Sequence, residues 1–253
     1  MSTRAVIQLT DLHLTPERGA ELCGVDTEAT FTATLDAALA EGPADAVLVT
    51  GDIAHDPTGP APYERFLDIV RQRHSGVLAC VPGNHDLIAS MLLAGMPMEN
   101  VDLGGWRIAL LDSHVDDVPG AEVADVQVDR LAADIADAGH VLVATHHPLF
   151  EVGCPWLDCD RIRSARLLEY LSSNVAVRAV TAGHVHQEMQ WLHAETAFYT
   201  TPSTCFQFEP NTHAPTLNQR PPGWRRFELH EDGRIDTHVR RVKGLSVSPV
   251  FKF

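Results

Sequence analysis

The chain has 253 residues, of which 45% are hydrophobic and 21% charged, a composition typical of globular proteins. This length is sufficient for one large core, so we expect a single domain over residues 1–253. Lys and Arg number 19 against 34 Asp and Glu, and the formal charge of −15 argues against a long nucleic acid as partner. No apolar run approaches the roughly 20 residues of a membrane span, and no hydrophobic signal core precedes the first predicted strand, so we expect no membrane span and a cytoplasmic protein.

The cysteines suggest neither a disulfide framework nor a zinc knuckle. They are odd in number, none forms a CxxC pair, and they stand at Cys23, Cys80, Cys154, Cys159 and Cys205. We therefore expect free thiols, and any bound metal must find other ligands.

Strand and helix patterns alternate through most of the chain. A β-branched strand over residues 4–10 is followed by a polar loop and an Ala-rich helix with Phe31, Leu35 and Leu39 on one face. Further strands are predicted over 46–50, 77–81, 106–111, 140–145 and 177–181, and further helices over 63–74, 125–138 and 160–171. This alternation predicts an α/β fold whose strands are covered on both faces.

After His186 the pattern changes to closely spaced strands. These are predicted over 189–193, 197–201, 224–230 and 235–242, with residues 231–233 as a hairpin turn. The spacing predicts an antiparallel second sheet. Residues 210–223 contain four prolines and few large apolar side chains, so we expect a long surface loop there.

Potential ligands follow the carboxyl ends of the predicted strands. In chain order they are Asp11, His13, Asp52, Asn84, His85, His146, His184 and His186. Taken singly each motif is weak, because Asp and Asn are common in caps and turns and a histidine at a strand end is often a surface residue. In open α/β sheets, however, the loops at the carboxyl ends of strands converge on one crevice. The recurrence of such residues at successive strand ends therefore indicates a shared metal site.

The motifs DLH, GD, GNHD, HHP and GHVH together resemble those of the calcineurin-like metallophosphoesterases. The resemblance implies a four-layer αββα sandwich, the metallo-dependent phosphatase fold, with two metal ions that share a carboxylate. Carried over to this chain, it assigns one ion to Asp11, His13, Asp52 and His186 and the other to Asp52, Asn84, His146 and His184. It also implies that His13, Asn84, His85 and His186 face the substrate.

The chemistry of these side chains agrees with that assignment. Imidazole, carboxylate and carboxamide ligands without thiolate suit Mn, Fe, Zn or Co, and we expect two divalent or trivalent ions, with Fe and Mn favoured. Asp52 is the candidate bridge, because one carboxylate can hold two ions about 3.5–4 Å apart, and a bridging hydroxide could then attack phosphorus. Two divalent ions would bring four positive charges against two negative ones from Asp11 and Asp52, which makes the pocket attractive to a phosphate ester.

Three further histidines have open alternatives. In the family the histidine of GNHD, here His85, faces the substrate phosphate, where it could stabilise developing charge or protonate the departing oxygen. The alternative is an orienting role in which His85 is hydrogen-bonded to Asp86. His146 and His147 compete for one ligand position, and the H-x-P pattern favours His146, leaving His147 to point away or to line the pocket edge. His55 could reach the pocket or be a solvated loop residue.

Segments outside the metal motifs resemble one branch of the family, the bacterial class III cyclic AMP phosphodiesterases. These segments are PLFEVGCPWLDCDRIRSARLLEYL, TPSTCFQFEP and PPGWRRFELHEDGRI. They imply hydrolysis of 3',5'-cyclic AMP to the 5'-mononucleotide. The alternatives are a broader phosphodiesterase acting on glycerophosphodiesters or 2',3'-cyclic nucleotides, and a binding module that has lost catalysis.

Residues around the pocket are assigned on weaker grounds. Residues 156–158 would form a lid and residues 205–207 a wall near the base or sugar, although plain packing is the alternative for both segments. Val250 and Phe251 could pack against a second subunit in a homo-oligomer or fold back onto their own chain.

Overall fold

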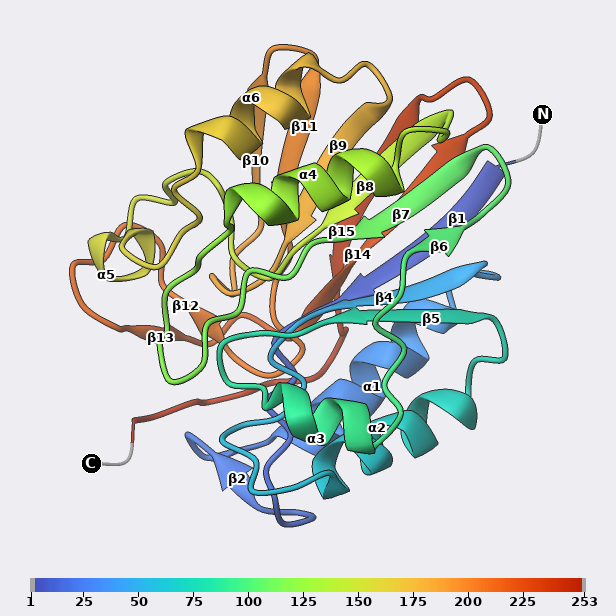
Figure 1. Ribbon diagram of the computed structural model, residues 1–253. Helices are drawn as coiled ribbons and strands as arrows, with labels where there is room; N and C mark the ends of the chain where they lie inside the picture. The colour runs from blue at the N-terminus through green and yellow to red at the C-terminus, as the bar shows by residue number, and fades with distance from the viewer. Residues whose placement is uncertain (1–2, 252–253) are drawn as a thin grey trace.

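The computed structural model describes residues 3–251, and most of its strands form two sheets (Figure 1). The first sheet has the order β15-β14-β1-β4-β5 and the second the order β10-β11-β9-β8-β7-β6. The strands of the first sheet are β1 Thr3–Leu9, β4 Ala46–Thr50, β5 Val77–Val81, β14 Gly223–His230 and β15 Ile235–Arg241. Those of the second are β6 Val101–Asp102, β7 Trp106–Leu110, β8 His140–Ala144, β9 Val177–Ala182, β10 Met189–His193 and β11 Thr196–Thr200.

Helices cover the outer face of each sheet (Figure 1). On the first sheet they are α1 Thr27–Leu39, α2 Ala61–Arg71 and α3 Ile88–Leu93; on the second, α4 Asp125–Asp134 and α6 Ala165–Ser173. Phe31 of α1 and Phe66 of α2 pack with Val47 and Val49 of β4 in one outer core. A separate outer core joins the second sheet to α4 and α6.

The inner faces of the two sheets pack against each other and form a third core. Leu48 of β4 points between the sheets, whereas its neighbours Val47 and Val49 point to the helices, as the period of two in a strand requires. Leu142 of β8 meets Leu48 in this inner core. The layers are therefore helix, sheet, sheet and helix, which confirms the four-layer αββα sandwich.

The later strands do not form a sheet of their own, so that prediction was wrong. Strand β11 pairs parallel with β9 and extends the second sheet, while β14 pairs antiparallel with β1 and extends the first. The turn between β14 and β15 is where it was predicted, and Gly233 adopts a φ of 85° in it. A period of two identifies the buried faces of a strand, but it does not identify the sheet that the strand joins.

Several short elements were not predicted from the sequence, or begin at a different residue than predicted. Helix α5 Pro155–Asp158 was missed. The helix predicted over 160–171 corresponds to α6, which begins only after Ser164, whose hydroxyl accepts a hydrogen bond from the amide of Leu167 at 3.2 Å. The hairpin of β2 Glu21–Leu22 and β3 Val25–Asp26 was missed, as was α3. The predicted loop over 210–223 contains β13 Leu217–Asn218, which pairs with β12 Gln207–Phe208.

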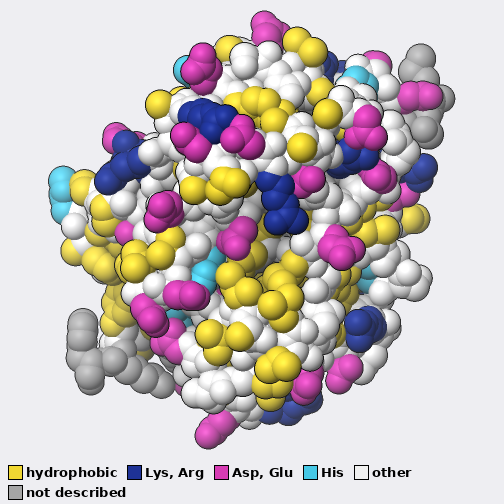
Figure 2. Space-filling model, viewed as in Figure 1, with side chains coloured by type: hydrophobic (Ala, Val, Ile, Leu, Met, Phe, Trp, Pro, Cys, Tyr) yellow, Lys and Arg dark blue, Asp and Glu magenta, His cyan; other side chains and the backbone are white. Residues whose placement is uncertain are grey.

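Both sheets direct the carboxyl ends of their parallel strands to one end of the molecule. Strands β1, β4 and β5 pair parallel in the first sheet, and β7, β8, β9 and β11 do so in the second. The short segments α5, β12, β13 and β2 gather at this end (Figure 1). On the face in Figure 2, acidic side chains are spread widely and the basic ones lie among them. Among residues 3–251, no helix combines the length and apolar character needed to cross a membrane.

Candidate functional site

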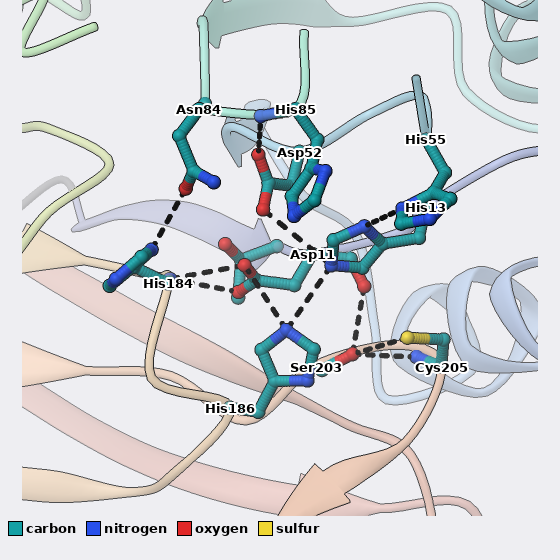
Figure 3. A network of polar contacts seen from close by, with 12 residues as sticks. Asp11, His13, Asp52, His55, Asn84, His85, His184, His186, Ser203 and Cys205 are labelled. Atoms are coloured by element: carbon teal, nitrogen blue, oxygen red, sulfur yellow. Dashed lines mark hydrogen bonds and ion pairs between the residues drawn. The ribbon is translucent and has the colours of Figure 1, made fainter. Parts of the chain in front are cut away.

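The loops that follow β1, β4, β5, β8 and β9 converge at this end of the two sheets. Figure 3 shows labelled side chains from the loops after β1, β4, β5 and β9. Close approach of the loops depends on glycine: a Cβ atom on Gly83 would lie 2.2 Å from Oδ1 of Asp52, and one on Gly183 would lie 1.9 Å from Oγ1 of Thr10. Five predicted ligands have positive φ angles, namely Asp11, His13, Asp52, His184 and His186. Non-glycine residues in this conformation are strained and cluster at functional sites, so their concentration here indicates that the loops are shaped for ligand binding.

One group of potential ligands contains Asp11, His13 and His186, all of which are buried. The Nε2 atoms of His13 and His186 lie 3.3 Å apart, and Nε2 of His186 lies 3.5 Å from Oδ1 of Asp11. The carboxylate of Asp11 is fixed by the backbone amide of His184, which lies 3.1 Å from each of its oxygens. These donor atoms therefore surround one small volume at the base of the pocket.

A second group contains Asn84, His146 and His184. The Oδ1 atom of Asn84 lies 3.0 Å from Nε2 of His146 and 2.9 Å from Nδ1 of His184. The two groups are adjacent. Each side chain that the sequence assigned as a metal ligand lies in one of them, except Asp52, which lies between them.

Asp52 connects the two groups through a single oxygen. Its Oδ2 atom lies 3.5 Å from Nε2 of His13 and 3.5 Å from Nε2 of His146. Its Oδ1 atom is occupied by the backbone amide of His85, which donates a hydrogen bond at 2.9 Å. A shared position for Asp52 was expected, but the geometry makes Oδ2 alone the oxygen that faces both groups.

The outward nitrogens of the buried imidazoles are held by backbone carbonyls. The Nδ1 atom of His146 lies 2.7 Å from the carbonyl oxygen of Thr50, and Nδ1 of His186 lies 2.7 Å from that of Phe206. Because a carbonyl only accepts, Nδ1 must carry the hydrogen, and this leaves Nε2 of each ring directed into the site.

When no metal is bound, burial and neighbouring charges set the protonation of the site's imidazoles and carboxylates. Burial lowers the pKa values of His13 and His184, which are thereby kept neutral. Burial also opposes the charged form of His146, but the carboxylate of Asp52 outweighs it and raises the pKa of His146 to about 9. The same pair holds the pKa of Asp52 well below its usual range although burial opposes this. Asp52 and His146 therefore form a buried ion pair that a metal ion would replace.

His85 lies beside this site, and the alternative in which it is hydrogen-bonded to Asp86 was wrong. Its Nδ1 atom lies 3.1 Å from Oδ1 of Asp56. Asp86 instead accepts hydrogen bonds from the backbone amides of Ala54 and Gly83, each at 2.9 Å, and so ties two ligand loops together. Burial opposes the charged form of His85, yet the carboxylates of Asp52 and Asp56 raise its pKa, which favours a ring able to donate a proton.

His147 and His55 were each given two alternative positions, and the structure places both side chains. His147 is buried next to His184, with ring centroids 4.5 Å apart, but its Nδ1 lies 2.9 Å from Oγ of Ser113 and its Nε2 lies 3.0 Å from the carbonyl oxygen of Pro119. Both of its nitrogens thus have partners outside the ligand groups. His55 lines the pocket and is not a solvated loop residue.

A pocket of about 320 Å³ lies above these groups, and one side of it is apolar. Its lining includes Trp156 and Leu157 of the predicted lid and Phe206 of the predicted wall. Cys205 and Gln207 are buried and do not line the pocket. Six lining residues were missed by sequence reasoning: Leu22, Cys23, Pro119, Asp160, Phe208 and Phe251.

The C-terminal segment folds back onto its own chain and completes this wall. Val247 is buried against Val25 and Phe206, and the amide of Val250 donates a hydrogen bond to the carbonyl oxygen of Cys23 at 2.9 Å. Phe251 thereby reaches the pocket. Of the two alternatives for Val250 and Phe251, the structure shows the one within the chain.

The donor set fits a pair of metal ions. With metal–ligand bonds of about 2.0–2.2 Å and angles of about 90–110° between them, ligands on one ion lie roughly 2.8–3.6 Å apart. The separations around Asn84 and Asp52 fall in this range, between 2.9 and 3.5 Å. Buried imidazole and carboxylate groups without thiolate suit borderline divalent or trivalent metals. A fold of this type with such a site defines the class of metal-dependent phosphoesterases.

Comparison with known proteins identifies the family. The model of the calcineurin-like phosphoesterase family matches residues 5–188, which include every predicted metal ligand. The chain belongs to this family.

The chain is also similar to curated bacterial enzymes over nearly its whole length. It is 36% identical to 3',5'-cyclic adenosine monophosphate phosphodiesterase CpdA of Escherichia coli K12, covering 96% of this chain and 92% of the relative. It is 35% identical to CpdA of Haemophilus influenzae with the same coverage. Among solved structures, a dimetal phosphatase from Danio rerio aligns with a TM-score of 0.63 at 14% identity, covering 95% of this chain and 99% of that one, which supports the fold.

Proposed function

We propose that the protein hydrolyses 3',5'-cyclic AMP, or a closely related cyclic nucleotide, to the 5'-mononucleotide with the help of two metal ions. Relatives with 34–36% identity over most of the chain are named cyclic AMP phosphodiesterases, and a more distant relative from Nostoc is named a 3',5'-cyclic-nucleotide phosphodiesterase. Asp11, His13 and His186 would hold one ion, and Asn84, His146 and His184 the other, with Asp52 shared between them.

Bound metal ions would supply positive charge for the phosphate and would bring the pKa of a coordinated water towards neutrality. The chain itself contributes the orientation of the ligands. Carbonyl oxygens hold His146 and His186 so that their Nε2 atoms point inward. Asp11 and Asp52 bring two negative charges, and Asp160, whose Oδ2 lies 3.7 Å from Nε2 of His184, brings a third, so two divalent ions would still leave a net positive charge that attracts a small anion.

We assign His85 as the residue that assists the departing oxygen. Asp56 contacts its Nδ1 atom at 3.1 Å, which leaves Nε2 available to the substrate. The raised pKa of His85 favours the protonated ring, which can donate a hydrogen bond or a proton as negative charge develops on the phosphodiester. No protein nucleophile is required.

The observation that carries the proposal is the combination of two kinds of surface in one pocket. Metal-ligand groups and His85 form its polar base, while Trp156, Phe206, Phe208 and Phe251 line its apolar side. A phosphodiester without a nucleoside needs only the polar bottom of the pocket. A nucleoside gains from the apolar side, because a purine ring can pack on aromatic side chains.

The test is a comparison of specificity constants for protein reconstituted with Mn²⁺. The substrates are 3',5'-cyclic AMP, 2',3'-cyclic AMP, bis-p-nitrophenyl phosphate and glycerophosphocholine. A clear preference for 3',5'-cyclic AMP is expected. If it is among the poorest substrates, the broader phosphodiesterase alternative replaces the cyclic nucleotide assignment while the metal site stands.

A second experiment tests the ligands themselves. Replacing Asn84 with Ala removes the oxygen that lies between His146 and His184, so most activity should be lost together with one equivalent of tightly bound metal. Asn174→Ala is the matched control, because Asn174 follows α6 and bonds to Tyr170 and Ala176. An Asn84→Ala enzyme with full activity and full metal content would reject the site.

Two further proposals follow from the sequence expectations. We favour Fe and Mn as the native ions, which elemental analysis of protein purified without chelator can check. We also place the activity in the cytoplasm, where the cyclic nucleotide would be produced. The oligomeric state stays a prediction that sedimentation can measure.

A further inference from the structure

The three imidazoles that face the base of the pocket through Nε2 differ in what holds their outward nitrogens. His146 and His186 each direct Nδ1 at a backbone carbonyl oxygen, at 2.7 Å in both cases. For His13 the partner is a side chain: its Nδ1 lies 3.3 Å from Nδ1 of His55. On its inward side, Nε2 of His13 lies 3.5 Å from Oδ2 of Asp52. Of these three imidazoles, His13 is therefore the one whose outward contact is to a side chain, and a substitution of His55 can remove that contact.

Backbone pairing places His55 beside His13. The loops after β1 and β4 run together: the amide of His13 donates to the carbonyl oxygen of Asp52 at 2.8 Å, and that of Leu14 to Ile53 at 2.9 Å. One step further, the amide of His55 donates to the carbonyl oxygen of Leu14 at 3.0 Å. The contact between the rings is thus part of a continuous arrangement of two loops.

The charges around His55 favour the tautomer that accepts from His13. Its Nε2 atom lies 3.8 Å from Oδ2 of Asp56, and a hydrogen on Nε2 is stabilised by that carboxylate. Nδ1 of His55 then carries a lone pair. It can accept a hydrogen bond from Nδ1–H of His13, and the lone pair of His13 is left on Nε2.

We propose that His55 is a positioning residue for the metal-binding His13, holding its tautomer and ring direction through the contact between the two Nδ1 atoms. The inference rests on the proposed function in one respect, namely that His13 binds a metal ion. Partners of this kind typically change metal affinity by about 10–100-fold. The effect should be confined to the ion held by Asp11, His13 and His186.

The test compares a substitution that cannot accept the hydrogen bond with one that can. His55→Leu has a similar volume and no acceptor, whereas His55→Asn places Oδ1 where Nδ1 of the histidine stands. His193→Leu, on the exposed edge strand β10, is the control. Metal binding is followed by titration of metal-free protein with Co²⁺, whose visible absorption reports its coordination, and with Mn²⁺ in competition with a chelator.

We expect wild type to bind two ions per chain, and His55→Leu to bind one of them about 10–100-fold more weakly with an altered Co²⁺ spectrum. The second ion should bind as in wild type, and His55→Asn and His193→Leu should resemble wild type at both sites. Equal metal affinities for His55→Leu and wild type would overturn the role of His55 and leave the proposed function unaffected. Wild-type protein that takes up only trace metal would overturn the proposed function. Urea unfolding of the metal-free variants checks folding, and if His55→Leu does not fold, His55→Ala replaces it.

Discussion

The close approach of the loops at Gly183 predicts a large cost for a single added methyl group. A Cβ atom there would lie 1.9 Å from Oγ1 of Thr10, 2.9 Å from Oδ2 of Asp11 and 3.0 Å from the carbonyl oxygen of Thr50. The hydroxyl of Thr10 would have to retreat from 1.9 Å to the 3.4 Å of an ordinary contact. Thr10 is fully buried and donates to the carbonyl oxygen of Thr50 at 3.1 Å, so moving it also breaks a hydrogen bond.

The magnitude follows from these two losses. Overpacking a core costs about 1–3 kcal/mol, and a lost buried hydrogen bond adds about 1 kcal/mol. We therefore expect Gly183→Ala to lower the free energy of unfolding by about 2–4 kcal/mol. Activity should fall as well, because the methyl group also presses on Asp11. The measurement is urea unfolding of metal-free protein, which separates folding from metal binding.

A double-mutant cycle tests the cause. Thr10→Ala removes the atom that the methyl group would strike, so Gly183→Ala should cost at least about 1 kcal/mol less in that background. Gly59→Ala is the matched control, since its Cβ would meet no atom within 4 Å. A cost below about 0.5 kcal/mol for Gly183→Ala, or strict additivity with Thr10→Ala, would refute the reasoning.

Three further predictions follow from the site. In metal-free protein the pKa of His146, about 9 when folded, exceeds its usual 6.5, so the stabilisation by Asp52 is complete below pH 6.5 and is lost as pH rises through 9. The difference in unfolding free energy between wild type and Asp52→Asn should shrink over that range, and a constant difference would contradict the ion pair. Phe251→Ala should raise KM for cyclic AMP about 2–10-fold without changing kcat, given the roughly 0.5–1.5 kcal/mol of an aromatic contact, and an unchanged KM would remove Phe251 from the substrate wall. Asp56→Asn should lower the pKa of His85, so the alkaline limb of the kcat profile should move to lower pH, and an unmoved limb would argue against His85 as the proton donor.

The sequence predicted the end of the molecule at which the candidate site lies because its signals are local. Alternating burial along β4 and β8 follows from the period of two, and polar residues at strand ends follow from the direction of parallel strands. Pairing of β14 with β1 joins residues more than 200 positions apart, such as Thr3 and His230. No local pattern specifies such a pairing, and the separate second sheet was predicted for that reason.

The same limit explains the errors within the site. Asp86 is the carboxylate next to His85 in sequence, but the turn directs it to the amides of Ala54 and Gly83, while Asp56 from another loop reaches His85. Phe251 carries no motif and lies far along the chain from the ligands. Its place in the pocket depends on the amide of Val250 and the carbonyl oxygen of Cys23, which only the folded backbone brings together.

The return of the C-terminal segment to the pocket matters for how the protein is handled. A purification tag or fluorescent partner attached directly behind Phe251 would begin next to a residue that lines the pocket. Such a fusion would shield the entrance, and the resulting loss of turnover would be mistaken for low intrinsic activity. Strand β1, in contrast, begins at Thr3 at the opposite end of the sheets (Figure 1). Fusions at the amino end therefore leave the entrance free, and activities measured with the two arrangements should not be compared directly.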